Sequence, residues 1–116
     1  MNVISPGSFV VVNLQNPKEK FWGMLVELGA HGIQMLGLDL NSFEDWTRMI
    51  VGNGRNIGMT MMFQPMWRIE RISLDQTVDD LLSLEAQFEV RVGMSIRQYL
   101  ESQLPPSAHE LDSEKM

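Results

Sequence analysis

The side chains that most often do chemistry in proteins are sparse in this chain of 116 residues. It has no cysteine and only two histidines, His31 in a glycine-flanked turn and His109 close to the C-terminal end. A zinc site needs several such ligands close together, so we expect no metal site. Both histidines are expected to be solvated, and no residue pattern indicates a bound cofactor.

Three carboxylates, Asp39, Glu44 and Asp45, form the densest acidic group near the apolar half of the chain. Paired carboxylates can act as general acid and base when they share a cleft. Glu44 and Asp45 are better explained as acids in the first turn of a helix, where the helix dipole favours them. The segment 52–55 lacks the Gly-Lys-Ser/Thr ending of a phosphate-binding loop. We therefore predict no catalytic residue, and an enzyme or small-ligand site around Asp39 and the segment 42–56 is a minor alternative.

The basic residues that could contact nucleic acid in the first part of the chain are Lys18, Lys20, Arg68 and Arg71. Arginine is well suited to phosphate and base contacts. The formal net charge is −6, however, and most of it comes from residues 76–116, which carry three basic and eight acidic side chains. An acidic protein gains little from the counterion release that drives nucleic-acid binding, so nucleic acid is a disfavoured partner.

A methionine-rich segment, residues 59–67, holds four of the ten methionines and two aromatic residues. Alternation places Ile57, Met59, Met61 and Phe63 on one face of a strand, which is the pattern of a core face. Three other residues are harder to place inside so small a core and are our candidates for an interface: Met62, Met66 and Trp67.

The elements that must position these residues begin with three apolar segments, at 9–14, 21–28 and 33–40, separated by polar and glycine-containing turns. This spacing predicts an antiparallel meander. Gly23 allows a sharp bend in the second strand. The third segment is apolar on both faces, so something outside the sheet should cover it. Two more strands are predicted at 57–63 and 69–74.

Helices are predicted from their caps. Ser42 should begin a helix that carries Phe43 and Trp46, and Ser83 a second helix that ends at Gly93. Ser95 and Gln98 form a capping-box pattern for a third. We therefore predict a mainly β fold with α-helices: a small five-stranded antiparallel SH3/Sm-like barrel at about 8–74, with a helix-loop insertion at 42–56 and C-terminal helices at 77–103. Residues 1–104 form one domain, and 105–116 are a disordered tail.

Composition is that of an ordinary globular protein, with 44% hydrophobic and 21% charged residues. No stretch approaches the ~20 apolar residues that a membrane helix needs. The N-terminal residues lack the pattern of a signal peptide, and the absence of cysteine fits the cytoplasm. We expect a cytoplasmic protein with no membrane partner.

The order of elements resembles the small SH3-like barrels, and in particular the Sm-like domains. Gly23-Met24-Leu25 stands where that class has its glycine-x-leucine pattern, and 68–72 is similar to its closing segment. The resemblance covers residues 8–74 and implies RNA binding through an acidic residue and an asparagine near the second turn. The matching positions here are Gly29 and Gly32, and the 42–56 insertion and the late helices are also departures. The chain is similar as well to small bacterial proteins.

Three functions follow. The first is a non-catalytic interaction module that self-associates, as a dimer by default on base rates or as a ring, which this barrel type also forms. The second is an Sm-like RNA-binding protein. The third is the small-ligand binder or enzyme around Asp39.

Overall fold

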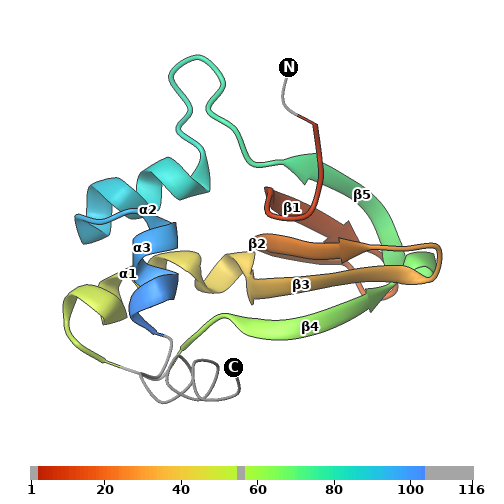
Figure 1. The fold of residues 1–116 in the computed structure, drawn as a ribbon, viewed down its shortest axis with the longest axis horizontal. Coiled ribbons are helices and arrows are strands. Elements are labelled where there is room, and N and C mark those ends of the chain that lie inside the picture. Colours follow the sequence, from red (N-terminus) through yellow and green to blue (C-terminus); the bar gives the residue numbers. More distant parts are fainter. Residues whose placement is uncertain (1–2, 55–56, 104–116) are drawn as a thin grey trace, which may run out of the picture.

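The computed structural model describes residues 3–54 and 57–103 of the chain. These residues form five β-strands, three α-helices and two short 3-10 helices, in the order β1 Phe9–Leu14, β2 Glu19–Leu28, β3 Gly32–Asp39, η1 Leu40–Ser42, α1 Phe43–Val51, β4 Thr60–Pro65, η2 Met66–Arg68, β5 Ile69–Leu74, α2 Leu84–Val92 and α3 Ile96–Ser102. Figure 1 shows the helices gathered at one end of the sheet and η2 at the opposite end. The tail predicted at 105–116 lies outside the described residues.

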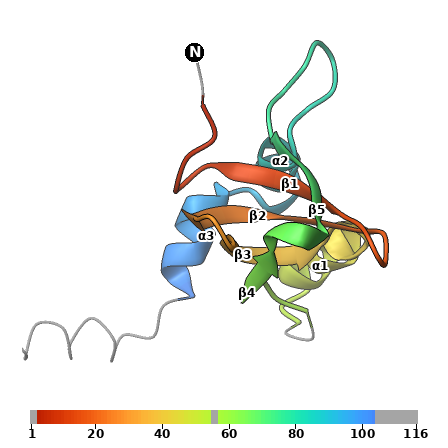
Figure 2. The same ribbon diagram turned by 90° about the vertical axis from the view of Figure 1, so that its right-hand side faces the viewer.

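A single antiparallel sheet contains all five strands, in the spatial order β4-β3-β2-β1-β5. The first three strands form the predicted meander, β4 extends it by pairing with β3, and β5 returns to pair with β1. β4 and β5 are the two edges and do not pair with each other, so the sheet is open and the predicted closure into a barrel is not formed. In Figure 2, which looks onto the η2 end, β1 to β4 follow one another down a curved sheet.

One face of the curved sheet encloses an apolar cluster to which every strand contributes. Its fully or almost fully buried members are Val10, Val12, Leu14, Leu25, Ile33 and Met35, and half-buried side chains from β2, β4 and β5 pack against them. The strict alternation of strand residues explains this set, because every second side chain of β1 points to the same face. We call this group the inner cluster.

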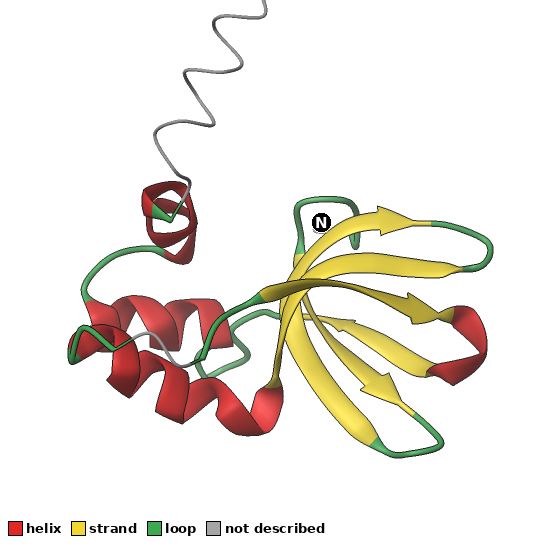
Figure 3. Cartoon of the chain, turned by 90° about the horizontal axis from the view of Figure 1, so that it is seen from below, coloured by secondary structure: helices red, strands yellow, loops and turns green. Residues whose placement is uncertain are grey.

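The other face of the sheet carries an aromatic cluster that joins it to the helices. Trp46 of α1 lies against the rings of Trp22, Phe43, Phe88 and Tyr99, with ring centroids 5.1–6.1 Å apart. Leu38 of β3 belongs to the same cluster. The third strand is apolar on both faces, and the helices provide the covering layer that this pattern predicted. Figure 3 shows the helical group on one side and the strands fanning out from it.

A pair of glycines brings β2 and β3 unusually close. Gly23 lies directly opposite Gly37. A Cβ atom at Gly23 would collide with the carbonyl oxygen of Leu36 and lie 2.6 Å from the Cα of Gly37. Close backbone approach is therefore the reason for a glycine here, in addition to the predicted bend.

The C-terminal helices begin at their predicted caps, but residues 77–82, which the prediction included in this helical region, form a loop with a bridge between Val78 and Leu81. The Ser83 side chain accepts a hydrogen bond from the Ala86 amide, and α2 ends at Gly93 in the left-handed conformation. Ser95 and Gln98 form the predicted capping box of α3. The fourth strand differs from prediction, because it begins at Thr60 rather than Ile57. Ile57 and Met59 precede it and pack against the aromatic cluster.

Candidate functional site

The edge strand β4 presents unpaired backbone groups to its surroundings. Its register with β3 pairs Met35 with Met62 and Gln34 with Phe63, and the Met66 amide donates to the His31 carbonyl at 2.8 Å. Hydrogen-bonded and non-hydrogen-bonded pairs alternate in an antiparallel ladder. The N–H and C=O groups of Met61 and Phe63 therefore point away from β3, toward the open edge.

The side chains at this edge are apolar and exposed. Met61 is 54% exposed, Phe63 57% and Trp67, in the adjoining η2, 66%. β4 contains no charged residue, whereas the opposite edge β5 carries the exposed Glu70 and Arg71. Proteins commonly use charges to keep a free sheet edge from pairing with another chain, and β4 lacks that protection. We call Met61, Phe63, Met66 and Trp67 the β4 edge surface.

The predicted interface residues divide between this surface and the interior. Met66 and Trp67 are exposed as expected. Met62 is instead half-buried against the inner cluster, and its sulfur accepts a 3.4 Å hydrogen bond from the side-chain amide of Gln64. The exposed apolar residues of the strand are its neighbours Met61 and Phe63. Alternation places Met61 and Phe63 on the same face as Ile57 and Met59, which pack against the aromatic cluster. Met61 and Phe63 lie beyond the part of this face that the helices cover, so their side chains are exposed.

Arg68 is held by the β1–β2 turn. Its guanidinium group donates to the carbonyl oxygens of Gln15 (3.2 Å) and Pro17 (2.9 Å) and forms a 2.8 Å ion pair with Glu19. The Arg68 side chain is only 17% exposed. These contacts give it a structural role at the turn and leave little of the group to meet a phosphate.

The other predicted basic contacts are exposed. Lys20 and Arg71 flank Asn13 on neighbouring strands. With its side-chain amide turned so that the oxygen faces Arg71, Asn13 accepts from Arg71 Nη2 at 2.9 Å and Nε at 3.2 Å. Lys18 lies in the β1–β2 turn. Lys20 and Arg71 thus lie on the two sides of Asn13. Arg68 is separated from them, because its guanidinium group is held by the β1–β2 turn.

The acidic residues of the insertion serve local structure. Asp39 Oδ1 accepts from the Asn41 amide at 2.8 Å and caps η1. Glu44 and Asp45 are exposed in the first turn of α1, where both pair with Arg48 at 3.5–3.7 Å. Trp46, in the same insertion, is fully buried in the aromatic cluster.

Two absences hold for residues 3–54 and 57–103. No group of three or more His, Cys, Asp or Glu side chains is placed to hold a metal ion, and His31 is exposed in its turn. No helix in this part of the chain has the length and apolar character needed to cross a membrane.

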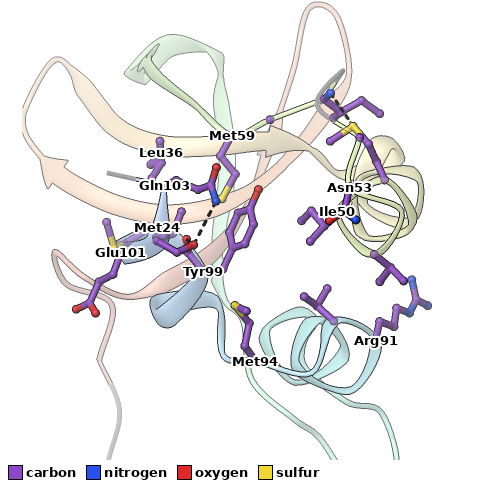
Figure 4. Close-up of a pocket in the computed structure, with 18 residues that line it drawn as sticks. Met24, Leu36, Ile50, Asn53, Met59, Arg91, Met94, Tyr99, Glu101 and Gln103 are labelled. Carbon is purple, nitrogen blue, oxygen red and sulfur yellow. Dashed lines mark hydrogen bonds between the residues drawn. The ribbon is translucent and has the colours of Figure 1, made fainter. Parts of the chain in front are cut away.

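A large cavity is lined in part by the insertion, and Asp39 is not among its lining residues. Its volume is about 940 Å³, and β2, β3, α1, the segment before β4, α2 and α3 all contribute to its wall. Four methionines line it: Met24, Met49, Met59 and Met94. Figure 4 shows Tyr99 and Met59 near its middle, with Arg91 and Glu101 at opposite sides. Sequence reasoning missed this cavity, because its lining comes from segments far apart in the chain.

Comparison with known proteins adds no relative to these observations: no protein-family model, no curated protein and no solved structure matches the chain. The function is therefore inferred from the geometry of the structure.

Proposed function

We propose that this protein is a non-catalytic interaction module that self-associates through strand β4. The supporting observation is the combination, in one strand, of unpaired backbone groups, exposed apolar side chains and no charge. An exposed apolar edge strand is a template for pairing with another chain. A second copy of this chain always offers the same complementary strand.

A two-fold arrangement of β4 satisfies both the backbone and the side chains. If two copies of β4 pair antiparallel about Met62, Met61 lies opposite Phe63 of the partner subunit, and the outward N–H and C=O groups of these residues face each other. Both side chains then lie on the same sheet face, where the Met61 sulfur packs against the Phe63 ring in a favourable contact. This contact is isologous, as in most homodimers.

The same proposal includes the finer fold type, a partly open SH3-like barrel. Every strand contributes to the inner cluster, and η2 joins β4 directly to β5. Barrels close because free edges are costly, so an open edge in such a fold favours pairing with another molecule.

The test is molar mass by light scattering behind size-exclusion chromatography. The unaltered chain should elute as a dimer, and Phe63→Lys or Trp67→Ala should shift it toward the monomer. Phe63→Pro should do the same, since it removes an outward N–H without breaking the β3–β4 ladder. Leu81→Lys is the control, because Leu81 is 76% exposed in the loop before α2 and lies outside the β4 edge surface.

The outcomes separate the candidate functions. A monomeric unaltered chain, or a dimer lost with Leu81→Lys and kept with Phe63→Lys, would overturn the β4 proposal. A species that carries nucleic acid, seen in its absorbance ratio, would favour the Sm-like alternative, with Lys18, Lys20 and Arg71 as its contacts. That alternative also predicts affinity that falls steeply with salt.

A further inference from the structure

The cavity between the sheet and the helices has the size and lining of a ligand site. Its volume of about 940 Å³ falls within the range of small-molecule pockets. Leu36, Ile50, Ile57 and Leu100 add to the four methionines of the wall. Methionine side chains are flexible and polarizable, so such a wall adapts to an apolar chain better than it selects a rigid shape.

The charged groups of the described lining are few and unevenly placed. Arg91 and Glu101 are the only charged residues that line the cavity within the described part of the chain, and they lie on opposite sides of it (Figure 4). Arg91 is positioned by two contacts: its guanidinium group is 3.6 Å from a Glu44 carboxylate oxygen and 5.8 Å from the centre of the Phe43 ring.

A second hollow adjoins the first at this arginine. It has a volume of about 350 Å³ and is lined by Glu44, Thr47, Arg48, Val51 and Arg91. Val51 and Arg91 line both hollows. A polar hollow with two guanidinium groups and one carboxylate thus borders the apolar cavity at Val51 and Arg91. Arg48 pairs with Glu44 and Asp45, and Arg91 pairs with Glu44, all at 3.5–3.7 Å. These long contacts leave guanidinium N–H groups for a further acceptor, since each guanidinium has five donors.

We propose that this pair of hollows binds an amphiphile with a single flexible apolar chain and a carboxylate head. The chain occupies the methionine-lined cavity, and the carboxylate meets Arg91 and Arg48. Binding at this site does not depend on pairing through β4, because the two surfaces share no residue.

The experiment is isothermal titration calorimetry of the full chain with decanoate and, separately, with methyl decanoate, its uncharged ester. We expect both to bind and decanoate to bind more tightly. Arg91→Gln should weaken decanoate about tenfold, the effect of one charge-assisted hydrogen bond, and leave the ester nearly unchanged. Arg97→Gln is the matched control: Arg97 also lies over a phenyl ring, that of Phe9, at 5.2 Å, but lines neither hollow.

Variants of the cavity wall test the apolar part. Leu36→Glu should abolish binding of both compounds, while Gln34→Glu, on the same face of β3 but outside the cavity, should not. Met94→Glu, in the turn between α2 and α3, offers a wall change at a less buried position. The proposal is overturned if neither compound binds, if Leu36→Glu and Met94→Glu bind like the unaltered chain, or if Arg91→Gln weakens both compounds equally. Light scattering on the same samples reports self-association separately.

Discussion

The indole nitrogen of Trp22 donates a 3.0 Å hydrogen bond to Oδ2 of Asp75, and this links the middle strand of the sheet to the segment that leads into α2. The same carboxylate accepts from the backbone amides of Leu84 at 2.8 Å and Glu85 at 2.9 Å. Asp75 therefore caps the N-terminus of α2 from nine residues away, in addition to the local cap by Ser83. One carboxylate fixes both the sheet and the helical layer.

Replacing Asp75 should destabilise the whole fold. Asp75→Ala leaves a buried indole N–H and two helix amides without their acceptor, so we expect a loss of about 3 kcal/mol in the free energy of unfolding. Urea denaturation measures it. Asp80→Ala, at an exposed position in the same loop, should change stability by less than about 0.5 kcal/mol. Equal effects of the two changes would show that the Asp75 contacts contribute little.

Arg68 offers a test of structure against nucleic-acid binding. Because its contacts to the β1–β2 turn are largely buried, Arg68→Ala should lower the free energy of unfolding by about 2 kcal/mol. Arg71→Ala, at an exposed site, should cost less than about 0.5 kcal/mol. If Arg68 served RNA binding and not the turn, Arg68→Ala would reduce RNA affinity and change the free energy of unfolding by less than about 0.5 kcal/mol.

The glycine pair of β2 and β3 predicts a strong steric effect. A methyl group at Gly23 meets backbone that cannot move away easily, so Gly23→Ala should cost about 3 kcal/mol of folding stability. Gly29→Ala is the control, because a Cβ there has only one neighbour, the Gly32 carbonyl oxygen at an ordinary 3.8 Å. Thermal unfolding monitored by circular dichroism compares the two. A Gly23→Ala variant as stable as the control would mean that the strands can separate without cost.

Glu85 makes stability depend on pH. Partial burial raises the pKa of Glu85 above its ordinary value of 4.5, the carboxylates of Asp75 and Glu89 raise it further, and Arg97 opposes the shift. A carboxyl group with a raised pKa favours the folded state when protonated, and this contribution is lost as the pH rises through the folded-state pKa.

It follows that Glu85→Gln should be more stable than the unaltered chain at neutral pH. The difference should shrink as the pH falls through the raised pKa, and vanish below 4.5, the ordinary value. Urea midpoints across this range measure it, with Glu101→Gln as a control for the loss of one charge. A stability difference that grows on acidification would contradict the assignment.

Local chemistry predicted more of this molecule than long-range chemistry did. The caps that begin α2 and α3 depend on residues a few positions apart, and the structure confirms them. The open edge depends on whether β4 and β5 meet, which no local pattern states. In the same way, Phe63 carries a core pattern, yet it is exposed because the helices end before they reach it.

The candidate sites show the same limit. Met66 and Trp67 are exposed, as expected of residues hard to place in so small a core, but the same reasoning included Met62 and not the exposed Met61. The role of Asp75 depends on Trp22, 53 residues earlier in the chain. The cavity needs six separate segments to come together, so its lining had no signature in the sequence.

The difference between the two sheet edges has a consequence for how far assembly can grow. When two copies join through β4, the combined sheet ends in β5 on both sides. Each of these new ends carries Glu70 and Arg71, whose charges oppose the addition of another strand. In the proposed assembly, growth would therefore stop after one step, and a closed pair would form instead of a fibre. In the proposed dimer, Glu70 and Arg71 of β5 thus limit the assembly to two copies.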